Sequence, residues 1–396
     1  MATVNSIPEL AALSPPAPAD LLVMVATLLP EQLVGLLANL GAIFPAGTTL
    51  IATESPVPER TSQLLRVVPA PPTNSTWSLA TSQFVHAWQF AQQSQAKAIL
   101  MLGPGAESLA PGALLQLSNA VLGGSVDLAM PRYELPPNAG LINSAILYPL
   151  TRALFSTNVR FPFAIDLALS PRMAQRLSNF AQRVLPADPT DALIWPVNEA
   201  AVANLSIEEF DVGRRTLPQP VDTDINAILA RVTGSLFADI ESKAAYWQRA
   251  RRIPPPRRAL AARPYSDGAA DVPRMVESFR FAYSNLLEIW SLVLPPHALL
   301  GLKRLSALNA AEFKMPDNLW ARIVFDFLVA YRQRTINRGH LLGAFIPLYL
   351  AWVAGHINLI AAGTDPESHL ETLAAAFEAD KPYIVSRWRW PDRFNA

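Results

Sequence analysis

The residues best placed for chemistry lie in the short loop Gly103–Glu107. This loop follows the apolar run Ala98–Leu102 and precedes a helix-like segment from about Pro111 to Leu122. A second apolar run, Val126–Met130, completes the order strand, turn, helix, strand, which is the pattern of a parallel α/β unit. Ligands bind just beyond the carboxyl ends of the strands in such sheets. The side chains at this loop therefore bear on what the protein can bind.

The side chains available there suit an anion better than a metal ion. Divalent cations are held by oxygen or imidazole ligands that converge from strand ends. The segment Gly103–Gly105 supplies no such side chain, and Glu107 lies further into the loop. Arg214 and Arg215 follow a later predicted strand, Leu205–Val212. Because arginine pairs bidentately with phosphate, this pair could replace part of a metal's charge.

The stretch Ala98–Tyr133 resembles the central segment of GT-A-fold glycosyltransferases. The similar group is family 2-like and includes mannosylglycerate synthase and glucosyl-3-phosphoglycerate synthase. The resemblance rests on the apolar strand, on SLAP before the helix and on YPLTRAL at residues 148–154. In that family the strand ends in Asp-x-Asp, which holds a divalent metal against the diphosphate of a nucleotide sugar. Here the two Asp positions fall on Gly103 and Gly105.

The resemblance also implies roles for two carboxylates. Glu54 stands where relatives carry an acidic residue that contacts the nucleotide base, although it could equally be a solvated loop carboxylate. Asp166 lies in a segment that usually contains two glycines, which Ala164 and Ile165 replace. Asp166 is the best candidate for a functional carboxylate, with a structural hydrogen-bonding role as the alternative. The family's metal-binding histidine has no counterpart, because no histidine occurs between residues 86 and 297.

These residues are compatible with three functions. Metal-dependent glycosyl transfer is disfavoured, since both aspartates and the histidine are replaced. Metal-independent transfer would use Arg214 and Arg215 with the arginine-rich segment 249–258, which could instead be a solvated linker, and Asp166 would position or deprotonate an acceptor hydroxyl. The third is a non-catalytic GT-A-fold protein that binds a nucleotide, a glycan or a partner protein. The resemblance implies a glycosyltransferase homologue that uses or binds a nucleotide-diphosphate sugar and a small hydroxylated acceptor, with the non-catalytic protein as the alternative. The replaced ligand positions predict that it does so without the usual divalent-metal site.

The composition limits the class of protein. The chain has 396 residues, of which 51% are hydrophobic and 16% charged, so a substantial folded core is expected. Lys+Arg and Asp+Glu number 32 each, and no aromatic residues accompany the arginine clusters, which argues against a nucleic-acid partner. Cysteine is absent, and no signal peptide is evident at the N-terminus, which favours a cytoplasmic protein.

The remaining patterns predict an α/β fold of the GT-A type, with a mixed sheet flanked by helices and a mainly α-helical C-terminal domain. The predicted domains are a flexible leader at 1–19, the GT-A-like domain at 20–248, a Pro/Arg-rich linker at 249–275 and the helical domain at 276–396. The apolar stretch Leu341–Ala362 is long enough to span a membrane, but Pro347, His356 and Asn358 interrupt it, so a buried core helix is predicted. The apolar helical domain is compatible with a homodimer or with a closed intramolecular core. Further elements are predicted as strands at Leu21–Ala26 and Thr48–Thr53, and as helices at Pro30–Leu40, Ser78–Ala96, Ile225–Trp247, Val276–Leu294 and Asp317–Gln333.

Overall fold

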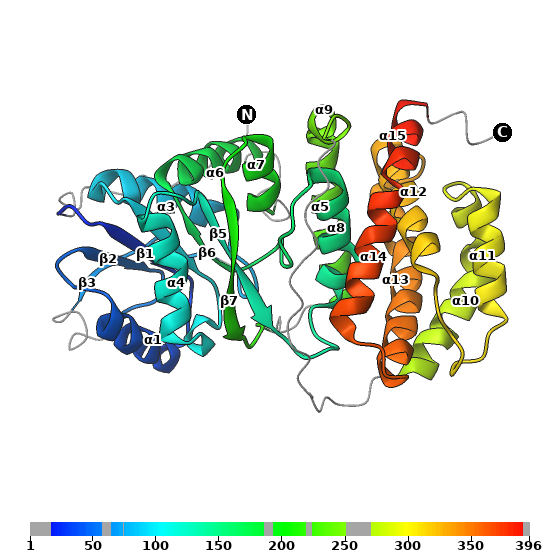
Figure 1. Ribbon diagram of the computed structural model, residues 1–396, viewed down its shortest axis with the longest axis horizontal. Helices are drawn as coiled ribbons and strands as arrows, with labels where there is room; N and C mark the ends of the chain where they lie inside the picture. Colours follow the sequence, from blue (N-terminus) through cyan, green and yellow to red (C-terminus); the bar gives the residue numbers. More distant parts are fainter. Residues whose placement is uncertain are drawn as a thin grey trace, which may run out of the picture. The chain divides into compact units, whose positions relative to one another are not determined.

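The computed structural model describes residues 17–57, 65–73, 75–185, 193–218, 224–250 and 271–390 (Figure 1). The chain forms two compact units, and each is built from two separate stretches of sequence. The first unit contains Met1–Glu134 and Ala164–Val221, and the second contains Leu135–Phe163 and Asp222–Ala396. Most of the predicted leader and of the predicted linker lies outside the described residues.

The first unit is built around a mixed sheet. Among the described residues, seven strands lie in the order β3-β2-β1-β4-β6-β5-β7. β6 is antiparallel to both of its neighbours, and the other pairs are parallel. The strands are β1 (Leu21–Val25), β2 (Thr49–Thr53), β3 (Arg66–Pro69), β4 (Ala98–Leu102), β5 (Leu128–Glu134), β6 (Asp166–Leu169) and β7 (Ile207–Arg214).

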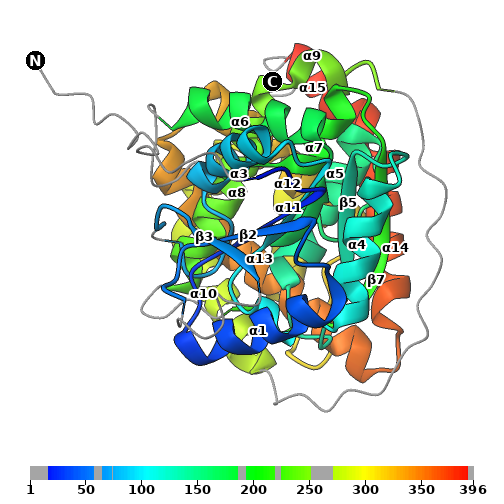
Figure 2. The ribbon, with the colours of Figure 1, turned by 90° about the vertical axis from the view of Figure 1, so that its left-hand side faces the viewer.

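Helices cover both faces of this sheet, which explains the continuous apolar character of its central strands. Every residue of β1, β2 and β4 is buried, as expected for parallel strands packed on both sides. Figures 1 and 2 show α1 and α4 on one face and α3 and α6 on the other. The helices of this unit are α1 (Pro30–Ile43), α3 (Thr81–Ser94), the 3₁₀ turn η1 (Ala106–Ser108), α4 (Pro111–Leu122), α6 (Pro171–Val184) and α7 (Pro196–Val202).

The strand registers bring distant segments together at one edge of the sheet. Leu102, the last residue of β4, pairs with Asp166, the first residue of β6. β5 runs antiparallel to β6, and Glu134 at its end pairs with Arg214 at the end of β7. The carboxyl ends of β4, β5 and β7 therefore meet at the edge where β6 begins.

The second unit is helical. Its helices pack in neighbouring pairs that include α5 with α14, α8 with α13, α10 with α13 and α11 with α12 (Figure 1). They are the π-helix η2 (Asn143–Leu147), α5 (Tyr148–Phe155), α8 (Ile225–Ser242), α9 (Ala244–Trp247), α10 (Val272–Ser291), α11 (Pro296–Ser306), α12 (Asp317–Gln333), α13 (Arg338–Ala361), α14 (Pro366–Ala379) and α15 (Lys381–Arg389).

α13 contains the apolar stretch for which a core helix was predicted. Within the described residues it is the one helix long and apolar enough to cross a membrane by length and composition. More than half of its apolar stretch is buried inside the unit. Leu341, Leu348 and Ala351 are fully buried, and the helix packs against α8, α10 and α12. This burial accounts for its composition without a membrane.

The predicted fold class, a GT-A-like mixed sheet flanked by helices and followed by a mainly helical region, is confirmed. The two units have different bounds from the predicted domains 20–248 and 276–396, because η2, α5 and α8 pack with the C-terminal helices. The predicted helix Ile225–Trp247 is divided after Ser242 into α8 and α9. Asp224 caps α8 by accepting a hydrogen bond from the backbone N–H of Asn226 at 3.1 Å.

Candidate functional site

A fully buried ion pair lies at the carboxyl ends of β4, β5 and β7, where β6 begins. The Arg215 Nε atom is 2.8 Å from Asp166 Oδ2, and neither side chain is exposed to solvent. The Tyr133 hydroxyl donates to the same oxygen at 2.9 Å, and the Gly103 N–H donates to Asp166 Oδ1 at 3.2 Å. We call Tyr133, Asp166, Arg215 and the segment Gly103–Gly105 the strand-end cluster.

The guanidinium of Arg215 also binds the loop that follows β4. Nη2 donates to the Pro104 carbonyl at 2.8 Å, and Nη1 donates to the Gly105 carbonyl. Nη1 further donates to Ser108 Oγ at 3.1 Å and to the Thr216 carbonyl at 2.8 Å. Each of the three guanidinium nitrogens is thus bonded inside the protein. Arg215 holds the loop against the end of β7, and a phosphate could reach it only by displacing these contacts.

Burial and the opposite charges of Asp166 and Arg215 determine the protonation states of the cluster. Burial alone would lower the pKa of Arg215, but the Asp166 carboxylate outweighs burial and raises the pKa. Burial and the negative charge of Asp166 raise the pKa of Tyr133 well above its usual range. Tyr133 therefore remains a neutral hydrogen-bond donor, and Arg215 remains a cation at all physiological pH values.

The residues present do not fit a divalent metal at this position. A Cβ atom on residue 103 would lie 2.7 Å from the Ile165 carbonyl oxygen and 2.9 Å from its Cβ. Gly105 has φ +80°, and a Cβ there would lie 2.6 Å from Arg215 Nη1. Carboxylates at either position would collide with the groups that fill this space. The one carboxylate of the cluster, Asp166, is paired with the Arg215 guanidinium, and the described residues hold no group of three metal-binding side chains.

Glu54 lies at the end of β2 and is bound by its neighbours. Its carboxylate accepts hydrogen bonds from the Thr27 hydroxyl at 2.7 Å, the Thr73 hydroxyl at 2.8 Å and the Gln83 side-chain amide. The Thr73 backbone N–H donates to it at 3.2 Å as well. These contacts join β2 to the loop before α3 and to α3 itself. They give Glu54 a structural role at the sheet edge, and whether it also contacts a base stays a prediction.

Two other predicted site residues are Glu107, which lies in the loop after β4, and Arg214, which is exposed to solvent. Glu107 lies in η1, and its Oε1 accepts from the Gln32 amide at 2.7 Å. Its buried Oε2 has no hydrogen-bond partner among the described residues. The Arg214 side chain is 70% exposed, with its Nε atom 3.9 Å from Glu134 Oε1. Of the arginine-rich segment, residues 251–258 lie outside the described residues.

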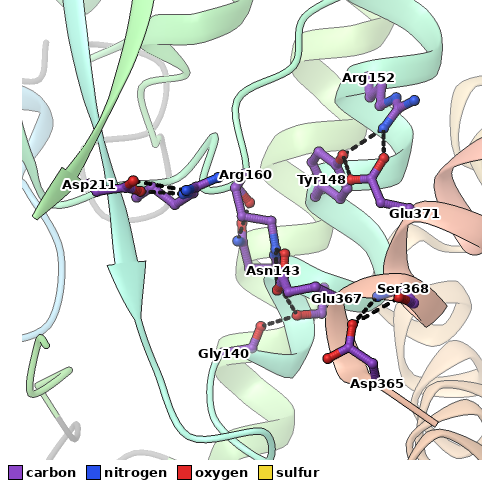
Figure 3. Close-up of polar contacts among 12 residues, drawn as sticks. Gly140, Asn143, Tyr148, Arg152, Arg160, Asp211, Asp365, Glu367, Ser368 and Glu371 are labelled. Atoms are coloured by element: carbon purple, nitrogen blue, oxygen red, sulfur yellow. Dashed lines mark hydrogen bonds and ion pairs between the residues drawn. The ribbon is translucent and has the colours of Figure 1, made fainter. Parts of the chain in front are cut away.

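The segment YPLTRAL forms α5 and uses its polar side chains within the second unit (Figure 3). Arg152 Nη1 lies 2.6 Å from Glu371 Oε2, and Arg152 Nε lies 2.9 Å from Glu378 Oε1. The Tyr148 hydroxyl donates to Glu371 Oε1 at 2.6 Å. These bonds join α5 to α14, so the described contacts of this helix are structural.

Sequence reasoning brought Asp166 and Arg215 forward separately but missed that they pair with each other. It also missed Tyr133, which supplies the third polar side chain of the cluster. One signal was available: Asp166 precedes the short apolar run Leu167–Leu169, Arg215 follows the predicted strand Leu205–Val212, and a mixed sheet can place such residues at one edge. The order of the strands was needed to make use of it.

No protein-family model matches the chain, and no curated protein sequence matches it. Solved structures that match include glucosyl-3-phosphoglycerate synthase from Mycobacterium tuberculosis in complex with Mn²⁺ and UDP-glucose, at 12% identity and TM-score 0.38 over 56% of this chain and 78% of that chain. A complex of this synthase with phosphoglyceric acid matches at 11% identity and TM-score 0.36 over 56% and 79% of the two chains. A further mycobacterial protein matches at 13% identity and TM-score 0.37 over 56% and 74%. Likenesses this distant do not establish a family or an activity.

Proposed function

We propose that this chain is a homologue of GT-A glycosyltransferases that functions as a non-catalytic binding module. The observation that carries the proposal is the buried Asp166–Arg215 pair, which fills the position where the sequence resemblance places a metal and a diphosphate. The cluster joins β4, β6 and β7 and leaves the α/β framework intact. Loss of the chemistry with retention of the fold accounts for both features.

Asp166, the carboxylate that the sequence favoured for catalysis, is not available to accept a proton from a substrate. A general base must come within hydrogen-bonding reach of the proton that it removes. Asp166 is fully buried and already accepts from Arg215, Tyr133 and the Gly103 backbone. Withdrawing one partner from a buried ion pair costs about 3–5 kcal/mol. A substrate that approached Asp166 would have to offset this cost before any reaction.

A second candidate function, metal-independent transfer to a hydroxylated acceptor, is favoured by one observation. Glu107 retains an acceptor oxygen without a partner among the described residues, whereas the oxygens of Asp166 are occupied. Glu107 follows the same strand end and could accept a hydroxyl proton once a ligand opens the loop. Its charge also opposes a bound diphosphate, so this mechanism would need cations beyond those of the cluster.

Calorimetric titration with UDP, GDP, UDP-glucose and GDP-mannose, in Mn²⁺ and again in EDTA, tests the proposal. Release of nucleoside diphosphate is measured in parallel over hours. We expect any nucleotide binding to be the same in both conditions and no diphosphate to be released. Turnover that needs Mn²⁺ would overturn the proposal. Turnover that persists in EDTA and disappears in Glu107→Gln would support the second candidate instead.

A further inference from the structure

The second unit contains a pocket of about 440 Å³ between α11, the segment 307–316 and the start of α12. A volume of this size is in the range of sites for small molecules. The polar lining of the pocket consists of four basic side chains and one amide: His297, Arg304, Lys314, Arg322 and Asn318. This basic pocket belongs to a single unit and does not rest on the function proposed above.

Positive charge in the basic pocket is only partly neutralised. None of its lining residues is an aspartate or a glutamate. Arg304 and Lys314 are exposed, and neither has an ion-pair or hydrogen-bond partner within the part of the chain that the structure describes. Exposed cations that face one concave surface favour a negatively charged ligand. Since the whole chain carries no net charge, this concentration is local.

Arg322 is held rigidly in the wall of the pocket. Its Nε atom lies 3.0 Å from Asp380 Oδ2, and its Nη2 donates to Asp380 Oδ1 at 3.3 Å. The guanidinium also stacks over the Tyr383 ring at 5.0 Å from the centroid. Nη1 points instead toward the pocket residue His297, with 3.2 Å between Nη1 and His297 Nε2. A guanidinium fixed in this way loses little conformational freedom when it binds a ligand.

The contact with Arg322 also affects the pKa of His297. Burial and the positive charge of Arg322 lower the pKa of His297, although Asp380 opposes them. At neutral pH the imidazole is therefore uncharged and accepts from the guanidinium through Nε2. Its Nδ1–H is then left as a donor. The pocket thus combines two cations whose side chains have no partner among the described residues, one oriented guanidinium and one neutral imidazole donor.

The start of α12 adds to the preference for an anion. This helix begins at Asp317 and has Pro316 at its N-cap, so the N-cap residue offers no side-chain acceptor, and Asn318 Oδ1 accepts from the Leu319 N–H at 2.9 Å within the first turn. Pro316, Asn318 and Leu319 line the pocket, which places the positive end of the helix dipole beside it. Leu305, Leu308 and Leu319 supply the apolar part of the lining. A ligand that fills this space has an anionic head and an apolar body.

We propose that the basic pocket binds a small phosphate monoester. The phosphate lies between Arg304 and Lys314 within reach of Arg322, and the organic part contacts the leucine side chains. A phosphate carries more charge than a carboxylate and accepts several charge-assisted hydrogen bonds at once. The phosphate could belong to a soluble metabolite or to a lipid head group, and the concave shape favours the soluble source.

The test uses the full chain with phenyl phosphate, pyrophosphate and inorganic phosphate as probes in calorimetric titrations. Arg304→Glu and Lys314→Glu reverse the charge of the two side chains that lack a partner in the described part of the chain. Lys303→Glu is the matched control, because Lys303 is exposed on the same turn of α11 and does not line the pocket. We expect each pocket variant to bind phenyl phosphate at least about tenfold more weakly, which is the effect of losing one charge-assisted hydrogen bond. The control should change affinity by less than about twofold.

Two further arms decide the source of the phosphate and the nature of the site. Co-sedimentation with phosphatidic acid vesicles, compared with phosphatidylcholine vesicles, detects a lipid head group. Binding to those vesicles that Arg304→Glu abolishes, without binding of phenyl phosphate, would assign the site to a lipid. Equal losses in Lys303→Glu and Arg304→Glu would overturn the proposal, since general charge would then explain the binding. Absence of binding to every probe would overturn it as well.

Discussion

Arg215 in the first unit and Arg304 in the second are both basic residues near the ends of secondary-structure elements, but their surroundings are opposite. Arg215 is completely buried and bonded through all three guanidinium nitrogens, chiefly to Asp166 and the loop after β4. Arg304 is exposed and has no partner among the described residues. The first arginine has become part of the framework, and the second remains available to a ligand. The residue type alone therefore does not say whether an arginine is a binding group.

The same contrast bears on where a ligand should be sought. The sequence resemblance directs attention to the strand ends of the sheet, where this chain has internal partners for each charge. The helical unit was predicted as an apolar domain, yet it holds the pocket with unneutralised cations. Four substitutions distinguish buried charges that have partners inside the protein from the exposed cations of the pocket, by their effects on the free energy of unfolding.

Removing the buried arginine should have the largest effect. Arg215→Ala leaves the Asp166 carboxylate buried without its cation, so we expect a loss of about 3–5 kcal/mol in the free energy of unfolding. Arg214→Ala is the neighbouring control, with a side chain that is 70% exposed, and should change stability by less than about 0.5 kcal/mol. Urea denaturation followed by tryptophan fluorescence measures both. Equal losses in the two variants would contradict the framework role of Arg215.

Restoring an aspartate at the loop should also destabilise the protein. The carboxylate of Gly103→Asp would enter space that Ile165 occupies, and overpacking of this kind costs about 1–3 kcal/mol. The double variant Gly103→Asp/Ile165→Gly should be more stable than the sum of the two single changes predicts. A double-mutant cycle from denaturation curves measures this coupling. Strict additivity would show that the Ile165 side chain does not exclude the aspartate and that its backbone carbonyl, which the double variant retains, does so.

Asp127 provides an intermediate case, because its carboxylate is buried while its partner Arg172 is 69% exposed. Hydrogen bonds from Arg172, and from Ser206 and Ser170, hold the pKa of Asp127 well below its usual range. A lowered pKa contributes stability above the unfolded-state pKa of about 4, and this contribution is lost as the pH falls below that value. We expect Asp127→Asn to cost about 1–2 kcal/mol at pH 7 and progressively less below about pH 4.

The measurement for this case is denaturation of wild type and variant between pH 7 and pH 3. Asp20→Asn serves as the control, because its carboxylate is 46% exposed and its partner Lys97 is 71% exposed. The control should show a smaller effect at pH 7 and a weaker dependence on pH. A stability gap for Asp127→Asn that widens in acid would contradict the assignment.

The smallest effect is expected from the pocket. Arg304→Ala removes an exposed cation that has no partner in the described part of the chain, so stability in phosphate-free buffer should change by less than about 0.5 kcal/mol. A slight gain is also consistent, because Lys314 and Arg322 line the same pocket. Thermal unfolding with and without added phenyl phosphate measures this change. A loss comparable to that of Arg215→Ala would remove the distinction between the two arginines.

The local structure of the chain was largely predictable. The run Ala98–Leu102 and the segment Pro111–Leu122 form β4 and α4 with the predicted bounds, and Asp317–Gln333 forms α12 as predicted. In each case the apolar periodicity and the flanking Gly or Pro residues act over a few neighbouring positions. The sequence by itself thus determined where most of the strands and helices form, that the sheet is covered by helices, and that Gly103 and Gly105 offer no side-chain metal ligand.

Only the tertiary structure decided what the charged residues do. Asp166 and Arg215 are 49 positions apart, and they meet because β6 lies antiparallel between β4 and β5, with β7 beside β5. Arg152 of α5 pairs with Glu371 and Glu378 of α14, more than 200 positions away. Local preferences cannot encode such meetings, because strand order and helix packing depend on burial summed over the whole chain. Whether a charge is neutralised within the protein or left for a ligand follows from those long-range contacts.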